Sequence, residues 1–155
     1  MWSGLAMELQ PVELTWNGYR ISTDPERLDL DKVHAFLNKE AYWAAGIPMA
    51  VLLKSVENSL CFGVYYQDQQ VGFARVISDF ATFAYLADVF IVEEHRSQGC
   101  GKWLMECIMG HPQLQSLRRW MLVTRDAHGL YAQYGFKPLA NPDRLMEIVN
   151  MEGYD

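Results

Sequence analysis

The first half of the chain carries hydrophobic residues at two spacings, one typical of strands and one typical of helices. Runs of β-branched and aromatic residues bounded by turn residues predict strands, and the turn-like Gln67-Asp68-Gln69 joins two of them into a hairpin. In chain order we expect a strand over 13–22, a turn at Asp24-Pro25, a helix with Leu30, Val33 and Leu37 on one face and Asp31 in its first turn, a helix over 48–56, and strands over 60–66 and 70–77.

The second half opens with a run over 82–92 in which Asp88 is the one charged residue, as expected for a central strand covered on both faces. A helical pattern follows over 99–109, and then a short strand over 120–124. This order of strand, helix and strand implies a right-handed parallel unit. The remaining elements are a helix over 127–134 that ends at Gly135 and a last strand over 145–149. The chain is therefore of mixed α/β class.

Composition limits what the protein does. Half of the 155 residues are apolar or aromatic, and no linker or repeat divides the chain, so we expect one domain over 1–155. Three cysteines without C-x-x-C spacing argue against a disulfide framework and a zinc site, and favour reduced thiols in the cytoplasm. No apolar run is long enough to span a membrane. A net charge of -6 disfavours nucleic acid as a partner.

The segment from Asp88 to Lys102 runs from a buried strand through a polar turn into a helix that opens with Gly99 and Gly101. Unpaired N–H groups and the helix dipole make such a terminus an anion site, and glycines let phosphate oxygens approach the backbone. Arg96 and Lys102 add positive charge. In the alternative interpretation the glycines only shape a turn. The sequence lacks both the Walker pattern for ATP and the Rossmann pattern for NAD.

Two motifs in this half resemble the GNAT superfamily of acyl-CoA N-acyltransferases. The first is Arg96-Ser97-Gln98-Gly99-Cys100-Gly101, which fits [R/Q]-x-x-G-x-[G/A]; the second is Leu130-Tyr131-Ala132-Gln133-Tyr134-Gly135-Phe136, which is similar to L-Y-x-x-x-G-F. The resemblance is closest over 72–138. It implies an α/β (α+β) fold with a mixed, mostly antiparallel sheet of about six to seven strands, about four flanking helices, and a parallel, splayed fourth and fifth strand.

The resemblance also implies the activity and the cofactor site. Family members transfer an acyl group, most often acetyl, from acetyl-CoA directly to a primary amine of a small molecule or peptide, and no metal is expected. Backbone groups of the splayed strand would hold the pantetheine arm, and amides of the glycine turn would hold the pyrophosphate. The implied cofactor-binding residues are Val89, Phe90, Ile91, Arg96, Ser97, Gln98, Gly99, Cys100, Gly101, Lys102 and Asp126, the last at a place often taken by asparagine.

Two residues are the catalytic candidates. Tyr131 occupies the place of the family's general acid, which protonates the CoA thiolate; the alternative is a packed helix tyrosine. Asp88 is the first candidate for the base, because a carboxylate in an apolar strand needs a partner or a task; the alternative is a structural Asp bonded to backbone or to an arginine such as Arg75. Asp79 is the second candidate. Cys100 is rejected as a nucleophile because no histidine has a suitable spacing.

The acceptor amine is not identified by any motif. Four aromatic residues are candidates for an acceptor pocket, or else for the core: Tyr42, Trp43, Phe80 and Phe83. The competing function is a non-catalytic acyl-CoA-binding sensor or regulatory domain. Either a monomer or a homodimer is compatible with the sequence.

Overall fold

A computed structural model describes residues 10–150 and 152–154 of the chain. Its framework is a six-stranded sheet in the order β1-β2-β3-β4-β5-β6. All neighbouring strands are antiparallel except β5 and β6, which are parallel, so the predicted mixed and mostly antiparallel sheet is confirmed. The strands are β1 (Glu13–Trp16), β2 (Tyr19–Ser22), β3 (Leu60–Tyr66), β4 (Gln69–Ser78), β5 (Phe83–Ile91) and β6 (Arg119–Leu122).

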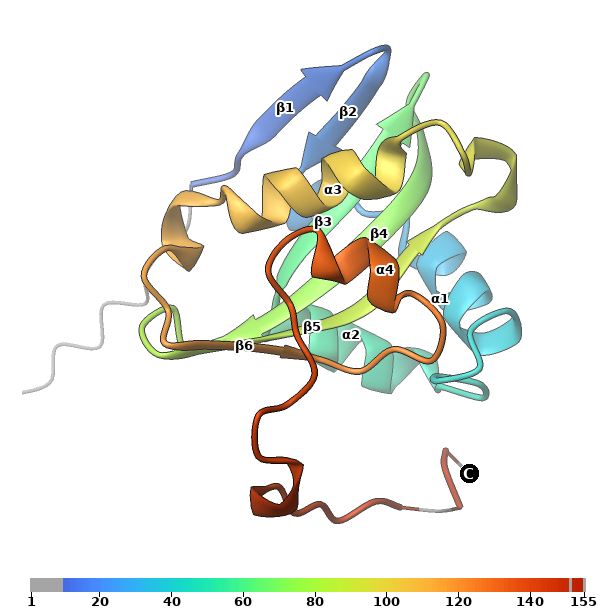
Figure 1. The fold of residues 1–155 in the computed structure, drawn as a ribbon. Coiled ribbons are helices and arrows are strands. Elements are labelled where there is room, and N and C mark those ends of the chain that lie inside the picture. Colours follow the sequence, from blue (N-terminus) through green and yellow to red (C-terminus); the bar gives the residue numbers. More distant parts are fainter. Residues whose placement is uncertain (1–9, 151, 155) are drawn as a thin grey trace, which may run out of the picture.

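Helices cover both faces of the sheet (Figure 1): α1 (Leu30–Lys39) and α2 (Met49–Glu57) lie on one face, and α3 (Cys100–Met109) and α4 (His128–Ala132) lie on the other. Short 3-10 turns lie at Pro25–Arg27, Glu93–His95, Pro112–Leu114 and Pro142–Arg144. Each face has its own core: one contains Val33, Leu37 and Phe73, and the other contains Leu104 and Ile108. No helix in the described part of the chain is both long and apolar enough to cross a membrane.

The first predicted strand is wrong in detail, because 13–22 is a hairpin rather than one strand. Asn17 and Gly18 form its turn with φ angles of 50° and 83°, and β1 and β2 pair on either side of them. An Asn-Gly pair is the sequence signal for this turn, since both of its central residues need positive φ. Asp31 lies in the first turn of α1, as expected, and the Asp29 carboxylate caps this helix by accepting a bond from the Lys32 amide.

The predicted strand over 145–149 is also wrong. These residues have no strand conformation, and the side chains of Met146 and Ile148 are 96% and 102% exposed. A strand needs a partner for its backbone groups. The chain after α4 instead leaves the body and lies below the sheet (Figure 1), where no element of the described chain pairs with it.

Two irregularities open the sheet at the end of β5. Phe73 pairs with Phe90 and Arg75 pairs with Ala87, so Ala74 alone stands opposite two residues of β5, Asp88 and Val89. This β-bulge bends the strand. On the other side, pairing between β5 and β6 ends at Leu86 and Leu122. The last residues of β5 therefore have no partner on the β6 side, and the predicted splay of the two parallel strands is confirmed.

Candidate active site

The N-terminus of α3 lies directly after the open end of β5. Gly99 is its N-cap residue in the left-handed conformation (φ 88°), and no side chain caps the helix. Within the described chain, the backbone amides of 97–99, 101 and 102 donate to no protein acceptor. The donors that the sequence predicted for a phosphate are therefore free of protein partners, and the helix dipole adds partial positive charge at the same place.

Gly99 and Gly101 lack a side chain for different structural reasons. A Cβ at Gly99 would lie 3.0 Å from the Trp16 ring, and its φ of 88° already disfavours any side chain. A Cβ at Gly101 would meet nothing within 4 Å. Protein packing therefore requires Gly99, whereas the space in front of Gly101 is open and available to a ligand. Trp16 is itself held by Trp103 of α3, with ring centroids 5.6 Å apart.

Backbone groups of β5 point into the opening between β5 and β6. The amide of Val92 donates to the Val71 carbonyl across the sheet at 2.8 Å. Because N–H directions alternate along a regular strand, the amide of the adjacent Ile91 points the opposite way, toward the splay. The Arg96 Nε donates to the Ile91 carbonyl at 2.9 Å, which places this guanidinium at the opening. The structure thus brings the strand and turn predicted to hold the cofactor to one place.

Asp88 lies in the bulge of β5 with a φ of 55° and makes two side-chain contacts. Its Oδ2 accepts from Arg75 Nε at 2.8 Å, and its Oδ1 accepts from Trp43 Nε1 at 3.0 Å. The side chains of Arg75 and Asp88 are only 16% and 9% exposed. Arg75 also donates to Ser59 Oγ at 3.2 Å. These are the contacts of the structural alternative that the sequence left open, and a base role for Asp88 stays a prediction.

Asp79 lies in the turn between β4 and β5, at the other end of β5 from Asp88. Its carboxylate accepts bonds from the Thr82 hydroxyl and from the amides of Ala81, Thr82 and Phe83. The Thr82 hydroxyl and these amides hold the pKa of the Asp79 carboxyl well below its usual range. Asp79 is therefore a turn-stabilising residue. Phe83, the first residue of β5, lies about 17 Å along the strand from Asp88 and so lies away from the opening.

Tyr131 of α4 is half-buried among aromatic side chains. Its ring meets Phe136 edge-on at 6.0 Å. The helix ends at Ala132, two residues earlier than predicted, and Gly135 follows in the turn with a φ of 94°. Burial raises the pKa of the Tyr131 phenol, and the Asp126 carboxylate and Tyr42 raise it further. The phenol is therefore protonated at neutral pH, which is the state that a general acid requires.

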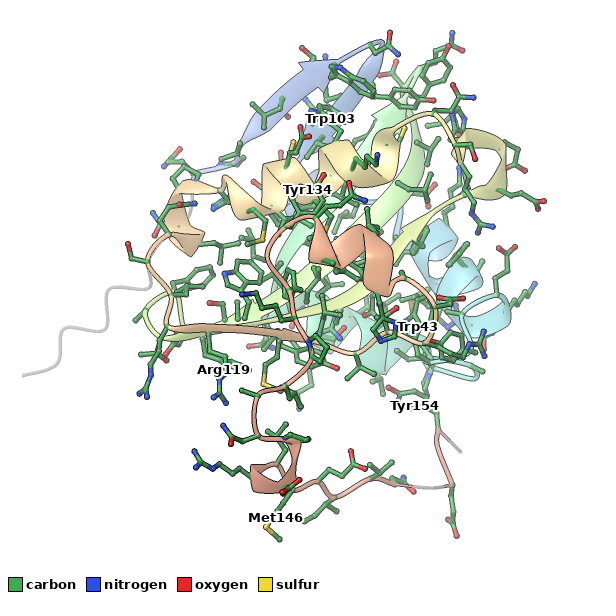
Figure 2. The ribbon with its side chains drawn as sticks, in the orientation of Figure 1. Trp43, Trp103, Arg119, Tyr134, Met146 and Tyr154 are labelled. Atoms are coloured by element: carbon green, nitrogen blue, oxygen red, sulfur yellow. The ribbon has the colours of Figure 1, made fainter. Side chains whose placement is uncertain are left out.

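Tyr134, which follows α4, contacts α3 because its hydroxyl donates to the Lys102 carbonyl at 2.9 Å. Tyr131 is the predicted general acid, whereas the contact of Tyr134 gives that residue a structural role. Figure 2 shows Tyr134 beneath α3, on the same side of the sheet. The carbonyl that it engages belongs to the same first turn whose amides are free.

Two exposed aromatic residues lie beside both catalytic candidates. Tyr42 and Trp43 are 51% and 45% exposed, and their rings meet edge-on at 5.1 Å. Trp43 contacts Asp88, while Arg125 lies 3.8 Å over the Tyr42 ring. Sequence reasoning missed Arg125, because a cation–π contact between 42 and 125 has no local signal. Tyr42 and Trp43 thus link the bulge of β5 to the loop that precedes α4.

Nucleophilic and metal chemistry find no support at this site. Cys100 is buried, and burial raises the pKa of its thiol against a weaker opposing hydrogen bond from Tyr19. His95 Nδ1 pairs with the Tyr19 hydroxyl at 2.9 Å. Among the described residues no group of three His, Cys, Asp or Glu side chains could hold a metal ion.

Comparisons with known proteins agree with this geometry. The model of the acetyltransferase (GNAT) domain family matches residues 57–138, more than half of the chain. A curated protein of Gibberella zeae that is described as an acetyltransferase is 34% identical over 93% of this chain and 94% of its own length. A crystal structure from Xanthomonas campestris pv. campestris, described as a GNAT-family acetyltransferase, is 51% identical, with a TM-score of 0.84 over 85% of this chain and 93% of that chain.

A more distant structure shares only the fold. It is described as an acetyltransferase with acetyl-CoA from Clostridium acetobutylicum, and it is 13% identical with a TM-score of 0.63 over 88% of this chain and 98% of that chain. The fold and the free amides beside two splayed parallel strands define an acyl-CoA N-acyltransferase. The chain belongs to the GNAT acetyltransferase family.

Proposed function

We propose that residues 1–155 form a single cytoplasmic N-acetyltransferase domain. It transfers the acetyl group of acetyl-CoA directly to a primary amine of a small molecule or peptide. The observation that carries this proposal is the set of free amides at the N-terminus of α3, directly beside the unpaired end of β5. The three cysteines are free and buried, which agrees with the cytoplasm.

Different residues would bind different parts of acetyl-CoA. The free backbone amides of 97–99, 101 and 102 would offer donors to a pyrophosphate, and Arg96 and Lys102 add positive charge. Backbone groups of Val89 and Ile91, on either side of Phe90, would offer strand-like hydrogen bonds to the pantetheine arm. The Ile91 carbonyl already accepts from Arg96, so Ile91 would contribute its N–H. The Asp126 carboxylate accepts hydrogen bonds but donates none, so it would serve only an N–H or O–H of the arm.

Tyr131 would supply the proton for the departing thiolate. The raised pKa of the phenol favours its protonated form, and α4, which carries it, lies on the same face of the sheet as α3. An amide N–H of β5, with Ile91 as the candidate, would stabilise the negative charge that develops on the thioester oxygen, an effect of about 3 kcal/mol at well-studied acyl transfer sites.

Asp88 has two proposed roles, which the variant Asp88→Asn distinguishes. As a base it would take a proton from the acceptor ammonium. Its two oxygens are already engaged by Arg75 and Trp43, however, so the contacts favour the second role, in which Asp88 fixes the indole of Trp43 beside the opening. Trp43 and Tyr42 would then form one wall of the acceptor site.

The direct test is to incubate the purified protein with acetyl-CoA and a panel of amines, following free thiol release. We expect turnover with some of the amines, and turnover that falls in Tyr131→Phe while CoA affinity is kept. Saturable CoA binding without turnover across a wide panel would instead support the sensor function. Absence of CoA binding would refute the proposal as a whole.

A further inference from the structure

Arg125 has an exposed guanidinium that no carboxylate of the described chain engages. It lies in the loop between β6 and α4. Neither of the two ion pairs within the described residues includes Arg125, and the side-chain hydrogen bonds that arginines make there come from Arg75 and Arg96. Its guanidinium carbon instead lies 3.8 Å from the centroid of the Tyr42 ring. The N–H donors of Arg125 are therefore available to a ligand.

The contact with Tyr42 fixes the orientation of this guanidinium. A separation of 3.8 Å is that of two planar groups in face-to-face contact, so the tyrosine ring covers one face of the guanidinium. The N–H bonds of a guanidinium point outward from its edge, where a stacked ring does not block them. Such an edge suits a group with two acceptor oxygens, because carboxylates and phosphates accept two parallel bonds from arginine. The stacking thus prepares Arg125 to bind an anion.

Arg125 lies beside the candidate general acid. The Ala127 amide donates to the Thr124 hydroxyl at 3.0 Å, and the Tyr131 amide donates to the Ala127 carbonyl at 3.3 Å. These bonds tie the loop that carries Arg125 to the short helix that carries Tyr131. Burial raises the pKa of the Tyr131 phenol, and Tyr42, which lies against Arg125, is close enough to raise it further. A group bound by Arg125 would therefore lie next to the place where the thioester reacts.

The acidic residues of this region leave the charge of Arg125 available. Asp88 is paired with Arg75 at 2.8 Å, so these two charges compensate each other. Asp126 follows Arg125 directly but forms no ion pair with it in the described chain, and the proposed function assigns its carboxylate to the pantetheine arm. The guanidinium is therefore a cation without a counter-ion in this part of the described chain, on the side of the opening that the acceptor would use.

We propose that Arg125 binds a carboxylate or phosphate group of the acceptor, so that the acceptor is a primary amine that carries an anionic group. This proposal rests on the proposed function, because it names the substrate class of that reaction. The carbon chain between the amine and the anion would lie against the wall formed by Tyr42 and Trp43, whose rings are 51% and 45% exposed. The arrangement would thus recognise three parts of one molecule: the amine, an apolar body and an anion.

Pairs of amines that differ in the charge of one group test this acceptor class. Glycine, β-alanine, 4-aminobutyrate and phenylalanine are compared with their uncharged amides, and O-phosphoethanolamine is compared with ethanolamine, with acetyl-CoA as the donor. The amino acids vary the size of the acceptor and the distance between its amine and its carboxylate, and the phosphate pair distinguishes the two anions. We expect a higher kcat/KM for the anionic member of the carboxylate pairs or of the phosphate pair.

The variant Arg125→Gln should remove this preference. Loss of a hydrogen bond to a charged group should lower kcat/KM for the anionic amine by about 10- to 150-fold, mainly through KM, while the uncharged amine keeps its value. Comparing both amines within each variant cancels their intrinsic reactivities. Arg125→Lys keeps the charge without the two-donor edge and should give an intermediate ratio. Arg119→Gln is the matched control, because it removes the same charge at the exposed start of β6 (Figure 2), and it should keep the wild-type ratio.

Binding is measured separately, by calorimetric titration of the CoA complex with the same amines. Tighter binding of anionic amines that weakens in Arg125→Gln supports the proposal; without turnover, the same result would refute the transfer reaction and leave the anion site supported. The proposal is overturned if the wild type binds no anionic amine more tightly than its uncharged partner, or if the preference survives in Arg125→Gln. An equal loss for both kinds of amine in this variant would also overturn it, because Arg125 would then only position the Tyr42 ring.

Discussion

The substitution Gly101→Leu tests whether the glycine turn binds the ligand, because it should block binding without disturbing the fold. A Cβ at 101 would meet no atom within 4 Å beyond its chain neighbours and the backbone of its own helix, so a side chain can start there without a clash. Leucine is also a better helix former than glycine by roughly 0.5–1 kcal/mol. We therefore expect Gly101→Leu to leave the melting temperature unchanged or to raise it by about 2–4 °C.

Binding of CoA should change in the opposite direction. A leucine side chain in the open space would keep phosphate oxygens from the amides over 97–102. Loss of two hydrogen bonds to a charged group costs about 3–6 kcal/mol, which is about a 100- to 20,000-fold rise in Kd. Isothermal titration calorimetry measures the Kd for CoA, and thermal unfolding of the same samples measures the melting temperature.

Two further variants control the experiment. Gly101→Ala adds only a methyl group, at a position where the family motif accepts alanine, and should bind CoA nearly as the wild type does. Gly99→Ala should instead destabilise the fold by about 1–2 kcal/mol, because φ is positive there and the new Cβ would press on Trp16. If Gly101→Leu binds CoA with wild-type affinity, the phosphate does not lie on this turn and the site is wrongly placed.

Three other predictions follow from the neighbouring residues. Tyr131→Phe should lower kcat by about 100- to 10,000-fold at unchanged CoA affinity; steady-state kinetics decides it, and an unchanged kcat would remove the phenol from the mechanism. Asp88→Asn keeps an acceptor for Trp43 but leaves Arg75 without its counter-charge, which should cost about 3 kcal/mol of stability. A base role predicts that kcat/KM of this variant loses the acidic limb of its pH profile, whereas a positioning role predicts that the limb stays. Asp79→Ala should lower the melting temperature at pH 7. Because the pKa of Asp79 is depressed in the folded state, its stabilising effect is present above the ordinary value of 3.8 and fades below it, so the wild-type and variant curves should converge in acid.

The sequence predicted most elements because each has a local signal. The central strand, the helix after the glycines and the turn at Gly135 that follows α4 all follow from periodicity and turn residues. The hairpin over 13–22 was missed although Asn17-Gly18 is a local signal for it. The strand over 145–149 was predicted from β propensity alone, and propensity does not supply the partner that a strand needs.

The acceptor side of the site depends on contacts that sequence cannot give. Trp43 meets Asp88 across 45 positions of the chain, and Tyr42 meets Arg125 in a loop that has no motif. Such pairs arise only when the sheet brings α1, β5 and β6 together. The cofactor side was accessible to sequence reasoning because its donors are backbone groups, whose positions follow from a strand, a turn and a helix in order.

The single charge that the sequence places in the buried strand, Asp88, corresponds to the β-bulge and its contacts. Its position in the sequence does not determine its chemical role. The bulge needs a residue that tolerates a φ of 55°, and aspartate is among the few side chains that do so readily. The same carboxylate neutralises Arg75 and accepts from Trp43. Backbone shape, charge pairing and the placement of an aromatic wall therefore meet in one residue. Its burial and its charge are explained by these contacts alone, so proton transfer by Asp88 needs support from kinetics rather than from its position.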